Sequence, residues 1–407
     1  MSHPSRSFPW LLRAALALVL LGGAAVPALA QDATPAADEP ALLVDDAATA
    51  NPDLVEVVID DPAGLGAPEQ MLMAPEGTTV SVVAAGIDRP RFMTFDDAGN
   101  LLVGGAGAGA VYRYSYADGM LGEQETLVDG LDQPASVALH TVDGTEYLYV
   151  GENYQVSRFT YDAAGPVGEQ EVVVPELPTG GHNTRTVAFG PDGMMYLAVG
   201  SSCNICEEED EIRATVARAN PDGSDLQIIA TGLRNAVGLA FDPTSGQLWA
   251  TVNERDTLGD EIPPDFVTMV HEGGYYGWPE CLPPAAVPQT EGADCSNVIP
   301  PTVGIQAHSA PLGLTFLDGE GIPADLSGDL VVVQHGSWNR SDPAEPKLLH
   351  IVLEDGQPVA AMDLVTGWQD ESGERWGRSA GIVVAPDGSL IVSDDENGMI
   401  YRVTLAG

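Results

Sequence analysis

The chain has 407 residues, of which 60 are acidic and 16 are basic, so its formal net charge is −44. Nucleic-acid binding and polybasic membrane attachment both require a positively charged surface, and this composition excludes both. Hydrophobic residues make up 44% of the chain, which is enough for a large folded core. The sequence therefore predicts a globular and strongly acidic protein.

The first thirty residues have the features of an export signal. Arg6 and Arg13 come before and within an apolar run, and Pro27-Ala28-Leu29-Ala30 matches the small-x-small pattern of a cleavage site. We therefore predict a signal peptide over residues 1–30 and a secreted or periplasmic protein. An uncleaved membrane anchor is the alternative, but the run is short for a span and contains glycine and proline.

Residues 31–76 differ in composition from the rest of the chain. They include 11 acidic residues and no lysine or arginine, interleaved with Ala, Pro and Thr. Such a composition is typical of a disordered tether, although LVEVVID at 54–60 could form a strand. We predict a mostly disordered acidic linker here, followed by one folded domain over 77–407.

From residue 92 onward one pattern recurs six times: a short apolar strand, a tight turn rich in Asp and Gly, and a second apolar strand. The copies span 92–105, 137–151, 187–200, 239–252, 314–333 and 382–393. Their first strands end 44 to 75 residues apart. Repeats of about 40–50 residues built from short strands are typical of β-propeller blades. A parallel α/β fold is the alternative, but no segment between the copies has a sustained helical period.

The copies continue with a third strand and usually a fourth. The last copy ends after its third strand, while VSVVAAGI at 80–87 precedes the first copy without a partner of its own. We predict that this N-terminal strand pairs with the last blade and closes the ring, because closure removes exposed strand edges. The predicted fold is all-β: a six-bladed β-propeller with four-stranded antiparallel blades.

Functional residues are expected on one face of this propeller. Because strand direction alternates, the loops entering the first strands and the loops following the second strands lie on the same face. The turns between first and second strands consist mostly of turn-forming residues. Basic residues and histidines gather instead in the other loops, at Arg89, Arg91, His182, Arg185, Arg234, His308, His335, Arg340 and Arg378. A cationic ring around the channel suits an anionic ligand that carries several carboxylates or phosphates.

Four segments on this face resemble the pyrroloquinoline-quinone (PQQ) dependent sugar dehydrogenases of the glucose/sorbosone dehydrogenase type. The segments are GGHNTRTVAFGPDG (180–193), GLRNAVGLAFDP (232–243), NERDTLGDEIPPD (253–265) with GGYYGWPE (273–280), and GRSAGIVVAPDG (377–388). The resemblance covers about residues 79–407. It implies an exported quinoprotein that oxidises an aldose or a sorbosone-like sugar by hydride transfer to PQQ and passes electrons to an external cytochrome or quinone.

The resemblance also implies residue roles. His182 occupies the position of the catalytic base, and histidine titrates near neutrality, as a base that accepts a hydroxyl proton must. Arg234 and Asn235 match the pair that donates to the quinone oxygens. Further cofactor contacts are implied for Arg378, which matches a carboxylate clamp, and for Trp338, Arg340 and Lys347. The residues Gln133, Arg185, His308 and His335 are equally consistent with binding and with structural roles.

Calcium is the metal that the resemblance implies, because it polarises the quinone and prefers oxygen ligands. The carbonyls of Arg255 and Asp256 would hold the cofactor's ion, and Asp260, Glu261 and the Tyr276 carbonyl would hold a structural one. A solvated acidic turn is the alternative for each of these residues.

The four cysteines are interpreted as two local disulfides. An even number in an exported protein favours disulfides, and we predict Cys203–Cys206 and Cys281–Cys295 among the three connectivities that four cysteines allow. A zinc site is the alternative, but it lacks a convincing histidine partner.

Two other functions stay open on sequence grounds. One is a calcium-dependent sugar-lactone hydrolase of the gluconolactonase type, which needs side-chain carboxylates on the channel axis. The other is a non-catalytic binding propeller. His182, Arg234, Asn235 and Arg378 together favour the dehydrogenase.

Overall fold

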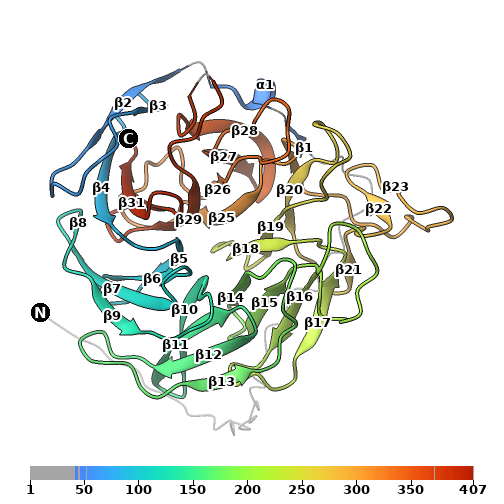
Figure 1. The fold of residues 1–407 in the computed structure, drawn as a ribbon, viewed down its shortest axis with the longest axis horizontal. Coiled ribbons are helices and arrows are strands. Elements are labelled where there is room, and N and C mark those ends of the chain that lie inside the picture. The colour runs from blue at the N-terminus through green and yellow to red at the C-terminus, as the bar shows by residue number, and fades with distance from the viewer. Residues whose placement is uncertain (1–41, 45, 52, 371, 407) are drawn as a thin grey trace, which may run out of the picture. The chain divides into compact units, whose positions relative to one another are not determined.

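A computed structural model describes residues 42–44, 46–51, 53–370 and 372–406. The predicted signal peptide, residues 1–30, lies outside this range. Within the compact unit that begins at Ala37, six small antiparallel sheets are arranged around a common centre, as Figure 1 shows. The predicted six-bladed β-propeller is therefore confirmed. No helix in the described part of the chain is long and apolar enough to cross a membrane.

The first three blades follow the chain in order. Blade 1 contains β5 (Pro90–Phe95), β6 (Asn100–Gly105), β7 (Ala110–Ala117) and β9 (Glu125–Val128), with β8 (Met120–Leu121) paired to the end of β7. Blade 2 contains β10 (Ser136–Val142), β11 (Thr145–Glu152), β12 (Gln155–Thr160) and β13 (Glu171–Val174). Blade 3 contains β14 (Arg185–Phe189), β15 (Met195–Val199), β16 (Thr215–Ala219) and β17 (Gln227–Thr231), with β21 (Gly274–Tyr275) added at its edge.

The remaining blades complete the ring. Blade 4 contains β18 (Ala236–Phe241), β19 (Leu248–Val252), β20 (Asp265–Met269) and β24 (Val303–Ile305), with β1 (Leu42–Leu43) at its edge. Blade 5 contains β25 (Pro311–Phe316), β26 (Leu330–Gln334), β27 (Lys347–Glu354) and β28 (Gln357–Val365). Blade 6 contains β29 (Ser379–Val384), β30 (Leu390–Asp394), β31 (Met399–Thr404) and β4 (Thr79–Ala85). A hairpin of β22 (Cys281–Leu282) and β23 (Val287–Pro288) lies outside the blades.

In several blades the second strand is buried along its whole length because both of its faces are covered. All five residues of β15, β19 and β26 are buried. Adjacent blades stack face to face: Trp249 of blade 4, for example, shares one apolar cluster with Leu314 and Leu349 of blade 5. A strand buried on both faces loses the alternation of polar and apolar residues, as these segments do in the sequence.

The blade turns opposite the candidate site are built from local side-chain contacts. In the turn of blade 3, the Met194 amide donates to the Asp192 carboxylate at 3.1 Å, and Gly193 has a φ of 76°. Aspartate stabilises such a turn, and glycine adopts the left-handed conformation without steric cost. These turns therefore need only turn chemistry, as the sequence indicated.

The N-terminal strand closes the ring. β4 pairs antiparallel with β31, with Val80 opposite Val403 and Ala84 opposite Ile400. The predicted closure at 80–87 is thus confirmed. The innermost strands contact one another in the circular order β5, β10, β14, β18, β25, β29 and back to β5.

The range 31–76, expected to be a mostly disordered linker, includes several described elements. They are β1, the short helical turn α1 (Asp46–Thr49), β2 (Leu54–Asp60) and β3 (Met71–Pro75). β2 and β3 form a hairpin, and β2 also pairs in parallel with β4. Leu72 and Ala74 of β3 are fully buried in the apolar cluster between blades 5 and 6. This hairpin therefore covers the outer edge of blade 6, while the domain boundaries themselves stay a prediction.

Replacing Leu72 with Ala should lower the free energy of unfolding by about 2–5 kcal/mol, because a fully buried leucine would leave a cavity. The neighbouring Met71→Ala is the matched control, since the Met71 residue is 44% exposed and its loss should change stability by less than about 0.5 kcal/mol. Urea unfolding of both variants measures the difference. Equal effects would show that the hairpin does not pack on the blade in solution.

Candidate active site

The loops on one face of the propeller are joined across neighbouring blades by hydrogen bonds. The Ser201 amide donates to the Arg234 carbonyl at 2.8 Å, linking blades 3 and 4. The Asn253 side chain donates to the Pro311 carbonyl at 2.6 Å, linking blades 4 and 5. The residues expected to carry function lie mainly in these loops. Their relative positions are therefore set by the ring rather than by single flexible loops.

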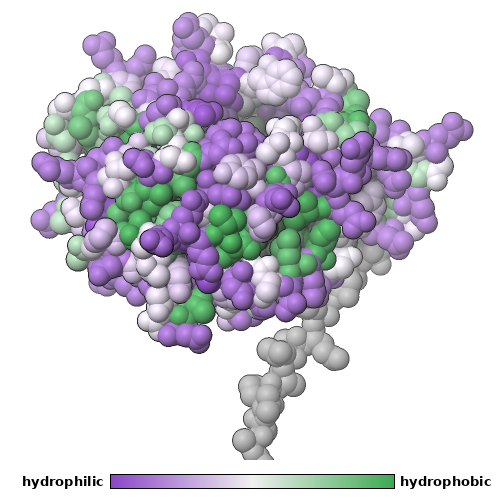
Figure 2. All heavy atoms as spheres, turned by 60° about the horizontal axis from the view of Figure 1, so that its bottom comes forward, coloured by the Kyte–Doolittle hydropathy of each residue, from purple (hydrophilic) through white to green (hydrophobic). Residues whose placement is uncertain are grey.

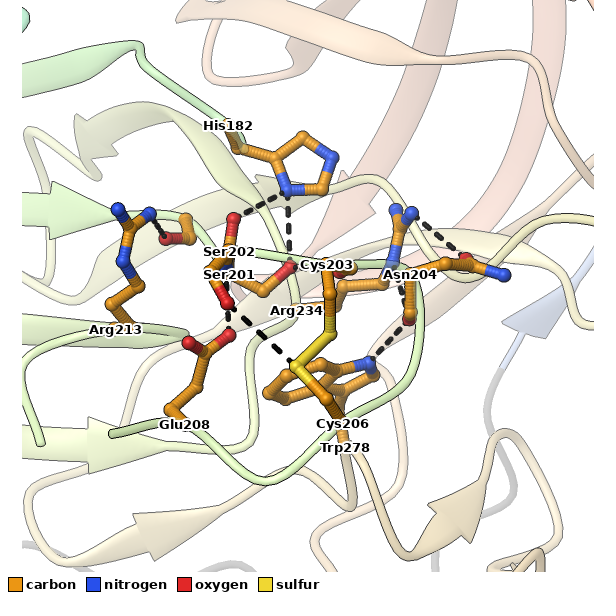
Figure 3. Close-up of a disulfide and its surroundings, with 11 residues drawn as sticks. His182, Ser201, Ser202, Cys203, Asn204, Cys206, Glu208, Arg213, Arg234 and Trp278 are labelled. Carbon is orange, nitrogen blue, oxygen red and sulfur yellow. Dashed lines mark hydrogen bonds between the residues drawn. A yellow bond between two sulfur atoms is a disulfide. The ribbon is translucent and has the colours of Figure 1, made fainter. Parts of the chain in front are cut away.

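His182 lies in the loop before β14 with one ring nitrogen engaged. Its Nδ1 is 3.0 Å from the Ser201 carbonyl oxygen and 3.0 Å from Ser201 Oγ. A carbonyl oxygen only accepts, so Nδ1 carries the proton and Nε2 carries the lone pair. In Figure 3 the other ring nitrogen points away from these contacts. His182 is thus oriented to accept a proton at Nε2.

The surroundings of His182 keep its ring neutral. Burial, followed by the positive charge of Arg234, lowers the pKa of His182 to about 4. A histidine with this pKa is unprotonated at neutral pH, as a general base must be. The pKa lies below the near-neutral value expected from the sequence, because burial and the charge of Arg234 disfavour the protonated ring.

Arg234, in the loop before β18, is almost fully buried and makes contacts with all of its guanidinium hydrogens. Nε donates to the Asn204 carbonyl at 3.1 Å, and Nη1 donates to the Asn253 and Glu254 carbonyls at 3.2 and 2.6 Å. Nη2 donates to Asn204 Oδ1 and Asp256 Oδ2, both at 3.0 Å. The five N–H groups of an arginine are therefore all used, and in this arrangement Arg234 offers charge rather than a spare donor.

Asn235 lies beside His182, with Gly200 between them. A Cβ atom on Gly200 would lie 2.3 Å from Asn235 Oδ1 and 2.6 Å from His182 Cβ, so only glycine fits there. Asn235 Nδ2 is 3.3 Å from Asn253 Oδ1, and Asn235 Oδ1 is buried without a hydrogen-bond partner among the described residues. His182, Arg234 and Asn235 are thus brought together, as their predicted roles require.

Asn204 links Arg234 to Asp256, and it was not among the site residues predicted from the sequence. It lies in the CNIC loop between Cys203 and Cys206, which form one of the two predicted disulfides. Besides accepting from Arg234, its side chain accepts from the Asp256 amide at 2.8 Å and donates to the Asp256 carbonyl at 3.0 Å. Its carbonyl also accepts from Trp278 Nε1 at 3.0 Å (Figure 3). One signal in the sequence indicated that Asn204 could organise the site: it lies between two paired cysteines in a loop of the functional face.

The second predicted disulfide, Cys281–Cys295, is also present and ties down the β22–β23 hairpin. No free cysteine exists among the described residues. Among the described residues, one group of three potential metal ligands lies close together: Cys203, Cys206 and Glu208. Both cysteines of this group are in the disulfide.

The residues expected to bind calcium are occupied by other partners. Asp256 Oδ1 accepts from Asn339 at 2.9 Å, and the Asp256 carbonyl accepts from Asn204 as described. Asp260 accepts from Ser341, and Glu261 pairs with Arg340 at 3.1 Å. These carboxylates face cations and amides and do not converge on one point in the described chain. The expected carboxylates thus form no cluster in the described chain, while the carbonyl ligands expected of Arg255, Asp256 and Tyr276 stay a prediction.

The other two residues of the expected calcium set are also engaged. The Arg255 side chain is fully buried, pairs with Glu254 at 3.1 Å and donates to the Cys281 carbonyl at 2.8 Å. Burial raises the pKa of Glu254 and lowers the pKa of Arg255. The Tyr276 hydroxyl donates to the Met269 carbonyl at 2.6 Å, with its ring in the core. Both side chains therefore have structural contacts, while calcium binding by the carbonyls of these two residues stays a prediction.

The expected cofactor contacts divide into two groups. Arg378, before β29, donates to the His335 and Gly336 carbonyls at 3.1 and 3.3 Å, and burial lowers its pKa. Arg340 donates to the Ala307 carbonyl at 3.2 Å as well as to Glu261, and Trp338 is 73% exposed. Lys347 is separate from them. It pairs with Asp363 of β28 at 2.9 Å and contacts Thr49 of α1, so it packs toward the outer strand of blade 5.

The second-tier candidates also have defined partners. Arg185 is fully buried and donates to the carbonyls of Pro178, His182 and Thr184, so it holds the His182 loop. His308 Nε2 contacts the Gly259 carbonyl at 2.8 Å. His335 Nδ1 contacts the Ser379 carbonyl at 2.8 Å, and burial lowers its pKa to about 3. Gln133 accepts from Asn183 at 2.7 Å and lines a cavity described below.

Several proteins of known structure or name are similar to this chain. A PQQ-dependent sugar dehydrogenase of Hypocrea jecorina is 24% identical over 357 residues, which cover 72% of this chain and 78% of that protein. A protein of Borreliella burgdorferi without an assigned function is 24% identical over 348 residues, covering 82% of this chain and 90% of that one.

Among solved structures, the holo form of the PQQ domain of a pyranose dehydrogenase from Coprinopsis cinerea has a TM-score of 0.72 and 22% identity. It is matched over 85% of this chain and 100% of its own. A calcium structure of a Trichoderma reesei family AA12 protein has the same TM-score, identity and coverage. These likenesses agree with the propeller fold described above.

The model of the TrAA12-like family matches residues 72–284 and 283–406, which together include all six blades. The resemblance inferred from four short segments thus extends over the whole propeller, and this chain belongs to the TrAA12-like family.

Proposed function

We propose that this protein is a PQQ-dependent sugar dehydrogenase whose catalytic domain is the propeller, residues 77–407. The observation that carries the proposal is His182, a neutral histidine whose Nε2 is left with its lone pair beside Arg234 and Asn235. The family membership and the names of the relatives support the same activity.

The face around His182 fits a polar, anionic cofactor. Five buried polar atoms there have no hydrogen-bond partner among the described residues: Asn235 Oδ1, His308 Nδ1, Ser309 Oγ, Gln334 Oε1 and Asn339 Oδ1. Buried polar atoms are normally paired, so a group of unpaired ones suggests a bound polar ligand. PQQ carries three carboxylates and a quinone, and Arg378, whose side chain donates to backbone carbonyls, would meet part of its negative charge.

In the proposed reaction this chain's own residues handle the proton and the charge. When bound, PQQ would take the hydride that the anomeric carbon of a sugar loses. His182 Nε2 would accept the proton of the sugar hydroxyl, while Ser201 keeps the ring in the required tautomer. Arg234, fixed by five hydrogen bonds, would stabilise developing negative charge through its field. No step is assigned to calcium.

We also infer that the protein works outside the cytoplasm and passes its electrons to an external cytochrome or quinone. The two disulfides support an oxidising compartment, in agreement with the predicted signal peptide. The hydrolase alternative needs converging carboxylates, and the described residues have no such cluster apart from the disulfide-bonded cysteines with Glu208. The dehydrogenase is therefore the better supported function.

His182→Ala should lower kcat for sugar oxidation by roughly 10²–10⁴-fold, because the general base is lost. PQQ affinity, measured by spectroscopic titration, should change little. The matched control is His140→Ala, since His140 stacks on Phe189 at 4.0 Å within blades 2 and 3 and has no part in the reaction. Dye reduction with a panel of sugars measures the rates. Full activity in His182→Ala would remove this histidine from the mechanism.

The rate should depend on pH through His182. Because its pKa is lowered to about 4, kcat/KM should fall only as the pH drops through about 4 and stay level near neutrality. Arg234→Gln removes a charge that lowers this pKa, so the acid limb should move to higher pH. An acid limb near the ordinary histidine value of about 6.5 in the unmodified enzyme would contradict the structure.

Acid stability has to be measured alongside this profile. An unfolded histidine binds protons below about pH 6.5, whereas folded His182 binds them only near pH 4. The free energy of unfolding therefore decreases as the pH falls through this window. Unfolding curves at each pH separate that loss from the kinetic effect.

Asn204→Ala should weaken PQQ binding by roughly tenfold, because the lost side chain frees Asp256 and Arg234 and each lost buried hydrogen bond costs about 1 kcal/mol. Quenching of tryptophan fluorescence by PQQ measures the affinity. Asn220→Ala, in an outer turn where Asn220 contacts Ser224, is the matched control and should bind normally. Unchanged affinity in Asn204→Ala would mean that the disulfide loop does not position the site.

A further inference from the structure

A small cavity opens on the same face, on the side of blades 1 and 2. It has a volume of about 120 Å³ and is formed by blades 6, 1, 2 and 3. Its lining residues are Arg89, Arg91, Ala106, Gln133, Ala135, Asn183, Thr184 and Asp395. Asn183 and Thr184 directly follow His182 in the chain, so the cavity adjoins the proposed base.

Arg89 is unusual among the cations of this protein. Arg6 and Arg13 lie outside the described residues, which leaves 14 of the 16 basic residues, and Arg89 alone among these is exposed. Its guanidinium makes no hydrogen bond or ion pair with any other described residue. In a chain with a net charge of −44, an unpaired cation at the wall of a cavity is the clearest sign of an anionic ligand.

The backbone of Arg89 is held in an unfavourable conformation. Its φ is 49°, and its carbonyl accepts from the Ala106 amide at 3.0 Å. Gln133, on the facing loop, has a φ of 51°. A left-handed conformation costs a residue other than glycine on the order of 1–3 kcal/mol and persists where the surrounding structure imposes it. The loop therefore presents Arg89 to the cavity at a fixed position.

The other charges of the cavity compensate one another. Arg91 pairs with Asp395 at 2.5 Å, and His335 Nε2 lies 3.5 Å from the same carboxylate. The charge of Arg89 therefore remains without a counterion in the described chain. Gln133 Oε1 accepts from Asn183, which leaves the Gln133 Nε2 hydrogens as additional donors toward the cavity.

The cavity is small and polar, so it offers room for a compact anionic group such as a carboxylate. Arginine and amide donors are the usual partners of a carboxylate.

We propose that this cavity is a carboxylate-binding subsite in which Arg89 is the specificity-determining residue. The inference rests on the proposed dehydrogenase function and extends it to a substrate class, sugars that carry a carboxylate. A carboxylate of the bound PQQ has the same chemistry and is the second source that the experiment must distinguish.

The experiment compares the full chain with Arg89→Gln and Arg89→Lys. Arg218→Gln is the matched control, because Arg218 pairs with Glu272 on the outside of blade 3. Three quantities are measured: the ratio of kcat/KM for glucuronate to that for glucose, the affinity of the PQQ-free protein for glucuronate by calorimetry, and the affinity for PQQ by titration. Low and high salt are both used, since screening weakens an exposed ion pair.

We expect the protein to prefer glucuronate to glucose and Arg89→Gln to reduce that preference by roughly ten- to a hundredfold, as the loss of a hydrogen-bonded charge implies. Arg89→Lys should restore part of it, and Arg218→Gln should leave it unchanged. If Arg89→Gln instead weakens PQQ binding tenfold and leaves the ratio unchanged, the carboxylate belongs to the cofactor.

The proposal is overturned if Arg89→Gln alters neither the glucuronate preference nor PQQ binding. A protein that binds PQQ but oxidises no sugar would refute the proposed function instead. In that case the calorimetric affinity for glucuronate, compared between the unmodified chain and Arg89→Gln, still decides whether the subsite exists.

Discussion

The geometry of this protein depends on the pairing of β4 with β31. Each blade stacks on two neighbours, so the positions of all six inner strands are set only when the last blade is complete. The last blade lacks its fourth strand until the N-terminal segment supplies it. Opening this seam would expose the edges of β4 and β31 and loosen the Arg91–Asp395 pair, whose members come from blades 1 and 6. The channel face is therefore a property of the closed ring.

On that face, hydrogen bonds between neighbouring loops hold the loops in place. Ser201 orients His182, and its amide donates to the Arg234 carbonyl. The Arg234 side chain donates to two loops, at Asn204 of blade 3 and at Glu254 of blade 4. The Cys203–Cys206 disulfide places Asn204 at the centre of these contacts. His182 and the charge of Arg234 are thus held in place by short-range bonds, as the proposed proton transfer requires.

The repeat pattern predicted the fold well because each blade has the same sequence of apolar strands separated by turn residues. Strand β24 was missed, because it has only three residues and follows the long segment that carries β21 to β23. The packed hairpin β2–β3 was also underestimated, because acidic surface residues dominate the composition around it. His182, Arg234 and Asn235 could be grouped from sequence, since each begins a blade.

Other features of the site depend on side-chain directions that a sequence does not contain. Asp260 and Glu261 have the composition of a calcium loop, yet they face Ser341 and Arg340. Lys347 begins a strand on the expected face, but its ammonium turns to Asp363. Asn204 contacts residues about 30 and 52 positions away along the chain, so only the folded ring reveals it. The motif therefore predicted which residues lie together at the candidate site, while their supporting contacts needed the structure.

The surface of this protein is dominated by acidic residues, and this affects how charged molecules approach it. Apart from Arg89, the described basic side chains are buried or partly buried, and hydrophilic residues cover much of the surface seen in Figure 2. The electrostatic potential around the protein is therefore negative in most directions. An approaching anion is repelled before it reaches the face that carries the candidate site. Added salt weakens that repulsion, so association with anions should speed up with ionic strength. A positively charged redox partner would be steered toward the protein by the same field.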